Sequence, residues 1–189
     1  MDLTTALRQY TLNPECDNNN YVLAKIYDHL GHTSSALSFY LRCAERTKQL
    51  PMAYECLVRL ALCLQSQGNR EFSYVQQLKH AITVMPDRPE AYFLLCQHLE
   101  SKREFYDEYM YSCIALKVSD FTDSFLHDEH LYFGKDSLEV CKAVSGVHWD
   151  KIEESKAIFT RLANQSKIDY IKTLSRSNLQ ALGMSPEHC

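Results

Sequence analysis

The chain has 189 residues, of which 46% are hydrophobic and 23% charged, the balance of an ordinary globular protein with a sizeable core. Its formal net charge of −4 and the lack of any run of Lys or Arg argue against binding to nucleic acid. No segment approaches the roughly 18 consecutive apolar residues of a membrane span, and the first residues form no basic and then apolar leader. We therefore expect a cytoplasmic protein that neither binds nucleic acid nor enters a membrane.

The eight cysteines follow neither a disulfide framework nor a zinc-site spacing. No CxxC pair occurs, and Cys43 and Cys96 fall at positions where neighbouring helices require a small residue. A buried free cysteine behaves as a small hydrophobic residue. We therefore expect reduced structural thiols, no bound metal and a reducing compartment.

The first predicted elements are helices separated by short polar or proline-containing turns. Residues 3–12 place Leu3, Leu7 and Tyr10 on one helical face, and Pro14 follows the segment. The polar run at 17–20 is typical of a helix start, because Asn and Asp side chains accept hydrogen bonds from free backbone N–H groups. In chain order, the helices that we then expect span residues 20–30, 34–48, 52–66 and 71–84.

The stretch 86–116 has the pattern of a helical hairpin. Pro86 and Pro89 end one helix and open the next, because proline suits a first helical turn and breaks a helix interior. After them, side chains recur at steps of three and four residues, which places them on one helical face. These residues are Tyr92, Leu95, Cys96 and Leu99. A second segment, with Phe105 and Tyr109, has the same spacing, so the hairpin needs similar neighbours to bury its faces.

After Leu116 the regular pattern is interrupted. Residues 119–130 form a longer and more acidic segment, which we expect to be irregular. Apolar residues at helical spacing then predict a helix that starts near Leu131 and ends near Gly146, and a partner helix after a turn at Trp149. A last helix over 167–183 has the polar outer face that the lid of a helical repeat array requires.

The predicted helices repeat one another. A shift of 38 residues aligns Tyr92 with Tyr54, and a further shift of 34 residues reaches the helix that contains Leu23. The pattern Tyr92-x2-Leu95-Cys96-x2-Leu99 resembles the first-helix signature of a tetratricopeptide repeat (TPR). The resemblance implies an all-α fold, a right-handed α-solenoid of TPR-like helical hairpins with a C-terminal capping helix.

The same resemblance implies a single TPR-like domain over residues 1–189. Its parts are a half-repeat at 3–14, repeats at 18–48, 52–85 and 89–117, a degenerate repeat at 130–164 and a capping helix at 167–183. Because the first unit is only half a repeat, either the array starts on a half-unit or the chain is part of a longer protein. We leave both interpretations open.

No group of residues predicts catalysis, so we expect a protein that is not an enzyme and uses no cofactor. The segment His127–His130 is the most metal-like cluster, but it lacks the i, i+4 histidine pair of an HExxH site and has no nearby Cys pair. We expect it to be a solvated acidic loop. Phosphate-binding glycine loops and nucleophile elbows are absent from the sequence.

The TPR resemblance implies a concave groove lined by first helices, in which a protein or peptide partner binds. The residues that this register places in the groove are Tyr21, Lys25, Glu55, Arg59, Phe93 and Gln97. Lys25 and Arg59 form a cationic row that suits acidic groups of an extended peptide, with Tyr21 and Phe93 beside it. Alternatively, Glu55 neutralises Arg59 within the chain.

Two subtypes can be considered within this resemblance. Chaperone-tail binders hold a terminal carboxylate with a clamp of Lys, Asn and Arg, but the corresponding positions here include Cys56, Glu90 and Leu94, which argues against a clamp. Separately, FYLRCAERT, RPEAYFLL and GVHWDKIEES resemble TPR regions attached to bacterial and viral glycosyltransferases. The alternative function is thus an accessory segment that recruits or positions an acceptor, with catalysis in a domain outside this chain.

Overall fold

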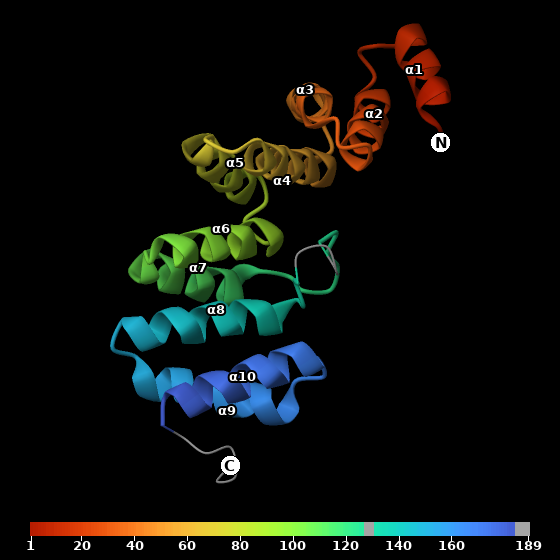
Figure 1. The fold of residues 1–189 in the computed structure, drawn as a ribbon. Coiled ribbons are helices and arrows are strands. Elements are labelled where there is room, and N and C mark those ends of the chain that lie inside the picture. Colours follow the sequence, from red (N-terminus) through yellow and green to blue (C-terminus); the bar gives the residue numbers. More distant parts are fainter. Residues whose placement is uncertain (127–130, 184–189) are drawn as a thin grey trace. The chain divides into compact units, whose positions relative to one another are not determined.

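The computed structural model describes residues 1–126 and 131–183, and ten α-helices make up the regular structure of these ranges (Figure 1). The prediction of an all-α fold is therefore confirmed. By its internal contacts the chain divides into two compact units, residues 1–86 and 87–189. The division falls between the second and third predicted repeats, and the assignment of one domain to the whole chain stays a prediction.

Unit 1 holds the first five helices and unit 2 the last five. In unit 1 they are α1 (Leu3–Leu12), α2 (Asp17–His29), α3 (Thr33–Arg46), α4 (Leu50–Gln67) and α5 (Glu71–Val84). In unit 2 they are α6 (Glu90–Lys102), α7 (Phe105–Val118), α8 (Lys135–His148), α9 (Ile152–Gln165) and α10 (Asp169–Ala181).

In unit 1 each helix packs against the next one along the chain, as expected of successive helical hairpins. The core of the unit joins α2, α3 and α4 through small side chains, among them Ala24, Ala36, Cys43 and Cys56, which lets the helices approach closely. Half of the 18 residues of α4 are buried, and they cover a broad face of the helix, which packs against both α3 and α5. A broad apolar face of this kind is turned towards the interior, so α4 is a central helix of unit 1.

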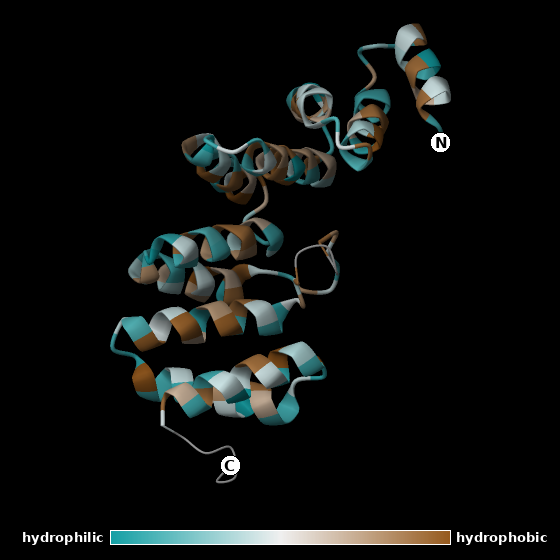
Figure 2. Ribbon diagram, in the orientation of Figure 1, coloured by the Kyte–Doolittle hydropathy of each residue, from teal (hydrophilic) through white to brown (hydrophobic). Residues whose placement is uncertain are grey.

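In unit 2, α6, α7 and α8 contact one another, and α9 and α10 continue the packing from α8 (Figure 1). Two apolar clusters join the last three helices. One centres on Ala143, Phe159 and Leu179, and the other on Val140, Leu162 and Ile171. The brown and teal bands along α8 in Figure 2 show how apolar and polar residues alternate to produce these faces.

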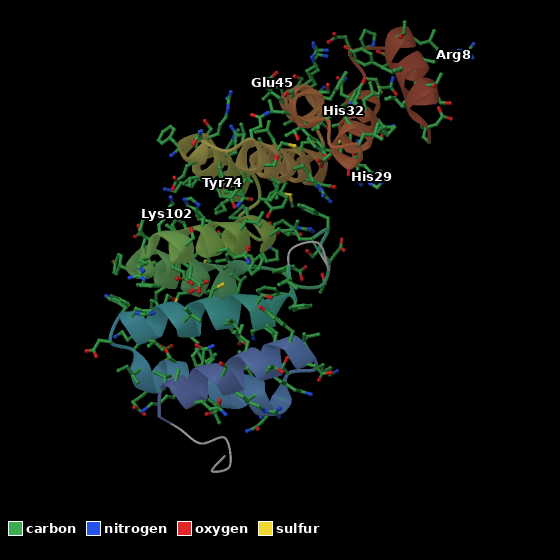
Figure 3. All side chains as sticks on the ribbon, in the orientation of Figure 1. Arg8, His29, His32, Glu45, Tyr74 and Lys102 are labelled. Carbon is green, nitrogen blue, oxygen red and sulfur yellow. The ribbon has the colours of Figure 1, made fainter. Side chains whose placement is uncertain are left out.

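The turns between helices use tight backbone conformations. Gly68 ends α4 with φ 68°, a left-handed value that glycine adopts without steric cost. The turn after α6 places Arg103 at φ 59°, and the turn after α8 places Asp150 at φ 55°. In the turn between α2 and α3, where Figure 3 labels His29 and His32, the His32 ring stacks on Tyr27 with 5.9 Å between ring centroids.

The helix predicted from near Leu131 to near Gly146 has different ends in the structure, where α8 spans Lys135–His148. It begins only at Lys135, because Gly134 has φ 64° and Leu131 φ 53°, values outside a right-handed helix. It also continues through Gly146 to His148. A Cβ on residue 146 would lie 2.5 Å from Ser155 Oγ, so this glycine allows α8 to approach α9 rather than ending the helix.

Candidate functional site

In unit 1 the structure brings together four of the predicted groove residues. Tyr21 and Lys25 come from α2, and Glu55 and Arg59 from α4. Lys25 Nζ lies 3.9 Å from Glu55 Oε1, and Arg59 Nε lies 3.6 Å from the same oxygen. Lys25 Nζ also lies 5.3 Å from the centroid of the Tyr21 ring. These residues form one charged cluster, which we call the α2–α4 cluster.

Glu55 is the centre of the α2–α4 cluster. Its side chain is 18% exposed, that of Arg59 is 13% exposed and that of Lys25 is 50% exposed. Burial raises the pKa of Tyr21, and the hydrogen bond that its hydroxyl donates to Glu55 raises this pKa further. The Glu55 carboxylate faces both Lys25 and Arg59. Glu55 therefore neutralises Arg59 within the chain, which is the alternative considered from the sequence. Lys25 is the more exposed of the two cations.

The α2–α4 cluster continues into the core as a second polar group. The Tyr40 hydroxyl donates a 3.0 Å hydrogen bond to Asp28 Oδ2, and Cys63 Sγ lies 3.9 Å from Asp28 Oδ1. Burial raises the pKa of the Cys63 thiol to about 12, with a further increase from the charge of Asp28. These groups are satisfied within unit 1, so they hold α2, α3 and α4 together rather than facing a ligand.

Unit 2 contains the other two predicted groove residues, Phe93 and Gln97 on α6. Phe93 is 4% exposed, with its ring 5.0 Å from that of Tyr132, whereas Gln97 is exposed. Both line a cavity of about 300 Å³ within unit 2. Its other walls come from α8 and α10 and from residue 131, and include Val140, Val144, Ile171, Leu174 and Asn178.

The cavity in unit 2 combines an apolar wall with a few polar groups. Glu100 lies at its lining together with the amides of Gln97 and Asn178. Burial raises the pKa of Glu100, while the charge of His148 lowers it. Asn178 Nδ2 donates a 2.9 Å hydrogen bond to the Leu174 carbonyl, which fixes the orientation of that amide. A cavity of this composition suits an apolar side chain with a polar or cationic neighbour.

The structure adds one ionisable group that the sequence did not single out. Glu108 on α7 has no exposed surface, and neither of its carboxyl oxygens has a hydrogen-bond partner among the described residues. Burial, followed by the charge of Glu100, raises its pKa to about 9. The signal that could have revealed it is the repeat register, because Glu108 occupies the position that buried Ala36 holds in the first full repeat.

The clamp positions and the metal-like cluster can also be placed. Cys56, Glu90 and Leu94 are buried, and Glu90 pairs with Arg88, so they face the interior of their units. The segment His127–His130 lies outside the described residues. Within 1–126 and 131–183, His, Cys, Asp and Glu side chains form no group of three or more that could hold a metal ion. In the same ranges, no helix has the length and apolarity needed to cross a membrane.

The fold is similar to a known structure. The crystal structure of a thermophilic TPR protein from Thermus thermophilus matches with a TM-score of 0.59 and 19% sequence identity, over 94% of this chain and 89% of that chain. No family model matches the sequence, and no curated protein matches it. The similarity establishes a TPR-like helical repeat fold, as predicted from the sequence. The glycosyltransferase resemblance stays a prediction.

Proposed function

We propose that this chain is a non-catalytic scaffold that binds a peptide segment of a partner protein. The observation that supports the proposal most is the cavity of about 300 Å³ in unit 2, whose lining includes Phe93 and Gln97. The repeat register had selected these two residues from the sequence alone. TPR-like first helices offer their free side to ligands, so a cavity at this place suits peptide recognition.

The partner segment that fits the cavity carries an apolar side chain next to Lys or Arg. The apolar side chain would pack against Val140, Val144 and Leu174, and the cation would lie near Glu100. A partner with an acidic residue at that place would instead meet the Glu100 carboxylate and be disfavoured. The volume accommodates one side chain of the size of Leu, Met or Phe, but not a folded domain.

An array of short random-sequence peptides, probed with the purified protein, tests this proposal. We expect selection of Leu, Ile, Met or Phe next to Lys or Arg. Leu174→Trp places an indole in the cavity and should weaken binding of the selected peptides at least about tenfold, equivalent to 1.4 kcal/mol. Glu100→Gln should keep the apolar preference and lose the basic one.

Glu104→Gln is the matched control, because Glu104 is exposed and lies outside the cavity lining. This variant should bind as the wild type does. Circular dichroism should show unchanged helicity for all three variants. If Leu174→Trp binds the selected peptides with unchanged affinity, the cavity is not the binding site and the proposal is wrong.

The proposal also includes the α2–α4 cluster of unit 1. Its cations, Lys25 and Arg59, would contact acidic groups of a partner. The double variant Lys25→Ala and Arg59→Ala should weaken binding of acidic peptides from the same array at least about tenfold, with helicity intact. Lys25→Ala alone should account for most of this loss, since the Lys25 side chain is 50% exposed whereas that of Arg59 is only 13% exposed. Equal affinity of the double variant and the wild type would remove unit 1 from the proposal.

The alternative function, an accessory segment of a glycosyltransferase that recruits or positions an acceptor, is tested by the full-length reading frame. A catalytic domain in the same frame as this chain would support it. A reading frame without such a domain would leave the free-standing scaffold as the proposal.

A further inference from the structure

The outer face of α7 carries an exposed apolar row. Tyr106, Met110, Ile114 and Val118 follow one another at steps of four residues, and their exposed fractions are 54%, 39%, 42% and 43%. The buried residues of α7, including Ser112 and Ala115, lie on the opposite face. We call these four exposed residues the α7 stripe. At 1.5 Å per residue it is about 18 Å long.

The α7 stripe is stiffened at one end by aromatic packing. The ring of Trp149, which follows α8, lies 4.9 Å from that of Tyr106 in an edge-on arrangement and 5.0 Å from that of Tyr109. Trp149 itself remains 36% exposed. A contiguous apolar surface with a rigid aromatic end is typical of a protein interaction site rather than of scattered surface residues.

Two opposite charges stand beside the α7 stripe at its two ends. Asp107 follows Tyr106 near the start of α7, and Lys117 precedes Val118 near its end, and both are exposed. Neither makes an ion pair with any residue in the part of the chain that the structure describes. A surface with an acid at one end and a base at the other is complementary to itself when it is reversed.

We propose that the α7 stripe binds the α7 stripe of a second copy of this chain, with the two helices antiparallel. In this arrangement Met110 of one copy lies opposite Ile114 of the other, and Tyr106 lies opposite Val118. Tyr106, the largest of the four side chains, meets Val118, the smallest. Met110 meets Ile114, which has a similar volume, so the pairs fill similar total volumes and can pack evenly along the interface. Asp107 of each copy then comes to the end at which Lys117 of the other copy lies.

The choice of a second copy over an unrelated partner follows from this self-complementarity. A two-fold interface uses the same patch on both subunits, so a patch must match its own reverse in charge and in size. The α7 stripe matches its own reverse in charge and in size, and all of its residues belong to a single helix. The inference goes beyond the proposed peptide site, because the cavity lining of unit 2 shares no residue with the stripe.

Sedimentation equilibrium of the full chain over a range of concentrations tests self-association. We expect the weight-average mass to rise from the monomer, 21.9 kDa, towards twice that value as the concentration increases. Met110→Glu with Ile114→Glu should abolish this rise. Leu41→Glu on α3 is the matched control, because Leu41 is also 39% exposed, and it should leave the rise unchanged.

Charge reversals test the antiparallel orientation. Asp107→Lys alone, or Lys117→Asp alone, places like charges at both ends and should weaken dimerisation about tenfold. The double variant with both reversals should recover wild-type dimerisation, and so should an equimolar mixture of the two single variants. A monomer at every concentration overturns self-association, and a double variant as weak as the single ones overturns the antiparallel arrangement. Circular dichroism confirms folding in each case.

Discussion

The carboxyl group of Glu108 lies inside unit 2 with no exposed surface. A buried carboxylate without a hydrogen-bond partner is strongly disfavoured, so the group stays protonated instead and its pKa rises to about 9. At neutral pH the folded chain therefore carries a neutral Glu108, whereas the unfolded chain carries a charged one. This difference makes stability depend on pH through one residue.

The direction of that dependence follows from proton counting. The unfolded chain releases this proton near its ordinary pKa of 4.5, and the folded chain only near pH 9. Between these values the folded state binds more protons, so the contribution of Glu108 to the free energy of unfolding falls as pH rises. It is lost progressively from about pH 5 and levels off above about pH 9.

Glu108→Gln tests this prediction because it keeps the shape of the side chain and removes the ionisation. Near pH 8 the variant should be more stable than the wild type by roughly 3–5 kcal/mol, because each pH unit above 4.5 costs the wild type about 1.4 kcal/mol, and the difference should vanish near pH 4. Urea unfolding followed by circular dichroism across this pH range measures it. If the free energies of unfolding of the wild type and the variant differ by the same amount at every pH, Glu108 ionises in the folded state as it does in water.

At the scale of helices, the contact between α8 and α9 depends on the missing side chain of Gly146. An ideal Cβ there would lie 2.5 Å from Ser155 Oγ and 3.5 Å from both Lys151 Cβ and Tyr109 Cε2. Ser155 is buried, so its hydroxyl has little room to move aside. The cost of the contact outweighs the gain in helix propensity of about 0.5–1 kcal/mol that alanine brings.

Gly146→Ala should therefore lower the free energy of unfolding by roughly 1–2 kcal/mol. Adding Ser155→Ala removes the oxygen that the new methyl group meets, so the double variant should recover most of the loss. Ser155→Ala alone is the control. Urea unfolding measures all three variants. If the two substitutions are simply additive, the overlap between residues 146 and 155 is not the cause of the loss.

Much of the helical organisation could be predicted, because the spacing of apolar residues in the sequence identifies the buried face of each single helix. Tyr92, Leu95, Cys96 and Leu99 were assigned to one face, and all four are buried. Helix α5 was predicted at the residues where it lies, since Pro86 closes it. The start of α8 was missed, because apolar Leu131 continued the pattern whereas Gly134 breaks the helical backbone.

The candidate sites could be predicted only in part, because they depend on contacts between helices. The repeat register placed Lys25, Glu55 and Arg59 near one another, but the sequence could not decide whether Glu55 faces solvent or the cations, and the structure places it beside both cations. The cavity walls from α8 and α10 were not foreseen, since no pattern in the sequence relates Val140 or Leu174 to Phe93. For the same reason the burial of Phe93 was not expected.

At the scale of the whole molecule, the cysteines at residues 1–126 and 131–183 are structural thiols. The seven in the described ranges are free, and five of them are buried. Two pairs lie close enough for hydrogen bonds, Cys43 with Cys56 between α3 and α4, and Cys96 with Cys141 between α6 and α8. Burial raises the pKa of Cys96, which keeps it in the unreactive thiol form.

Thiol titration of the denatured, non-reduced protein should therefore find all eight cysteines of the sequence. The reason is that the pKa values of Cys56, Cys63 and Cys96 are raised, so these thiols supply little thiolate for oxidation. Cys43, whose pKa is lowered by its hydrogen bond with Cys56, is buried away from solvent oxidants. Treatment with a metal chelator beforehand should leave the thermal unfolding curve unchanged. Six or four titratable thiols would instead indicate that one or both of the close pairs form disulfides, and a chelator-induced loss of stability would indicate a bound metal.

The turns at Arg103 and Asp150 have a consequence for how the sequence can change over time. Side chains with a Cβ are strained at φ 59° and φ 55°, by roughly 1–2 kcal/mol for a residue such as arginine. Glycine would relieve that strain at the same backbone angles. The chain thus retains unused stabilising substitutions in its helix connections. Such a reserve lets a lineage accept destabilising changes elsewhere in the chain and compensate for the lost stability in the helix connections.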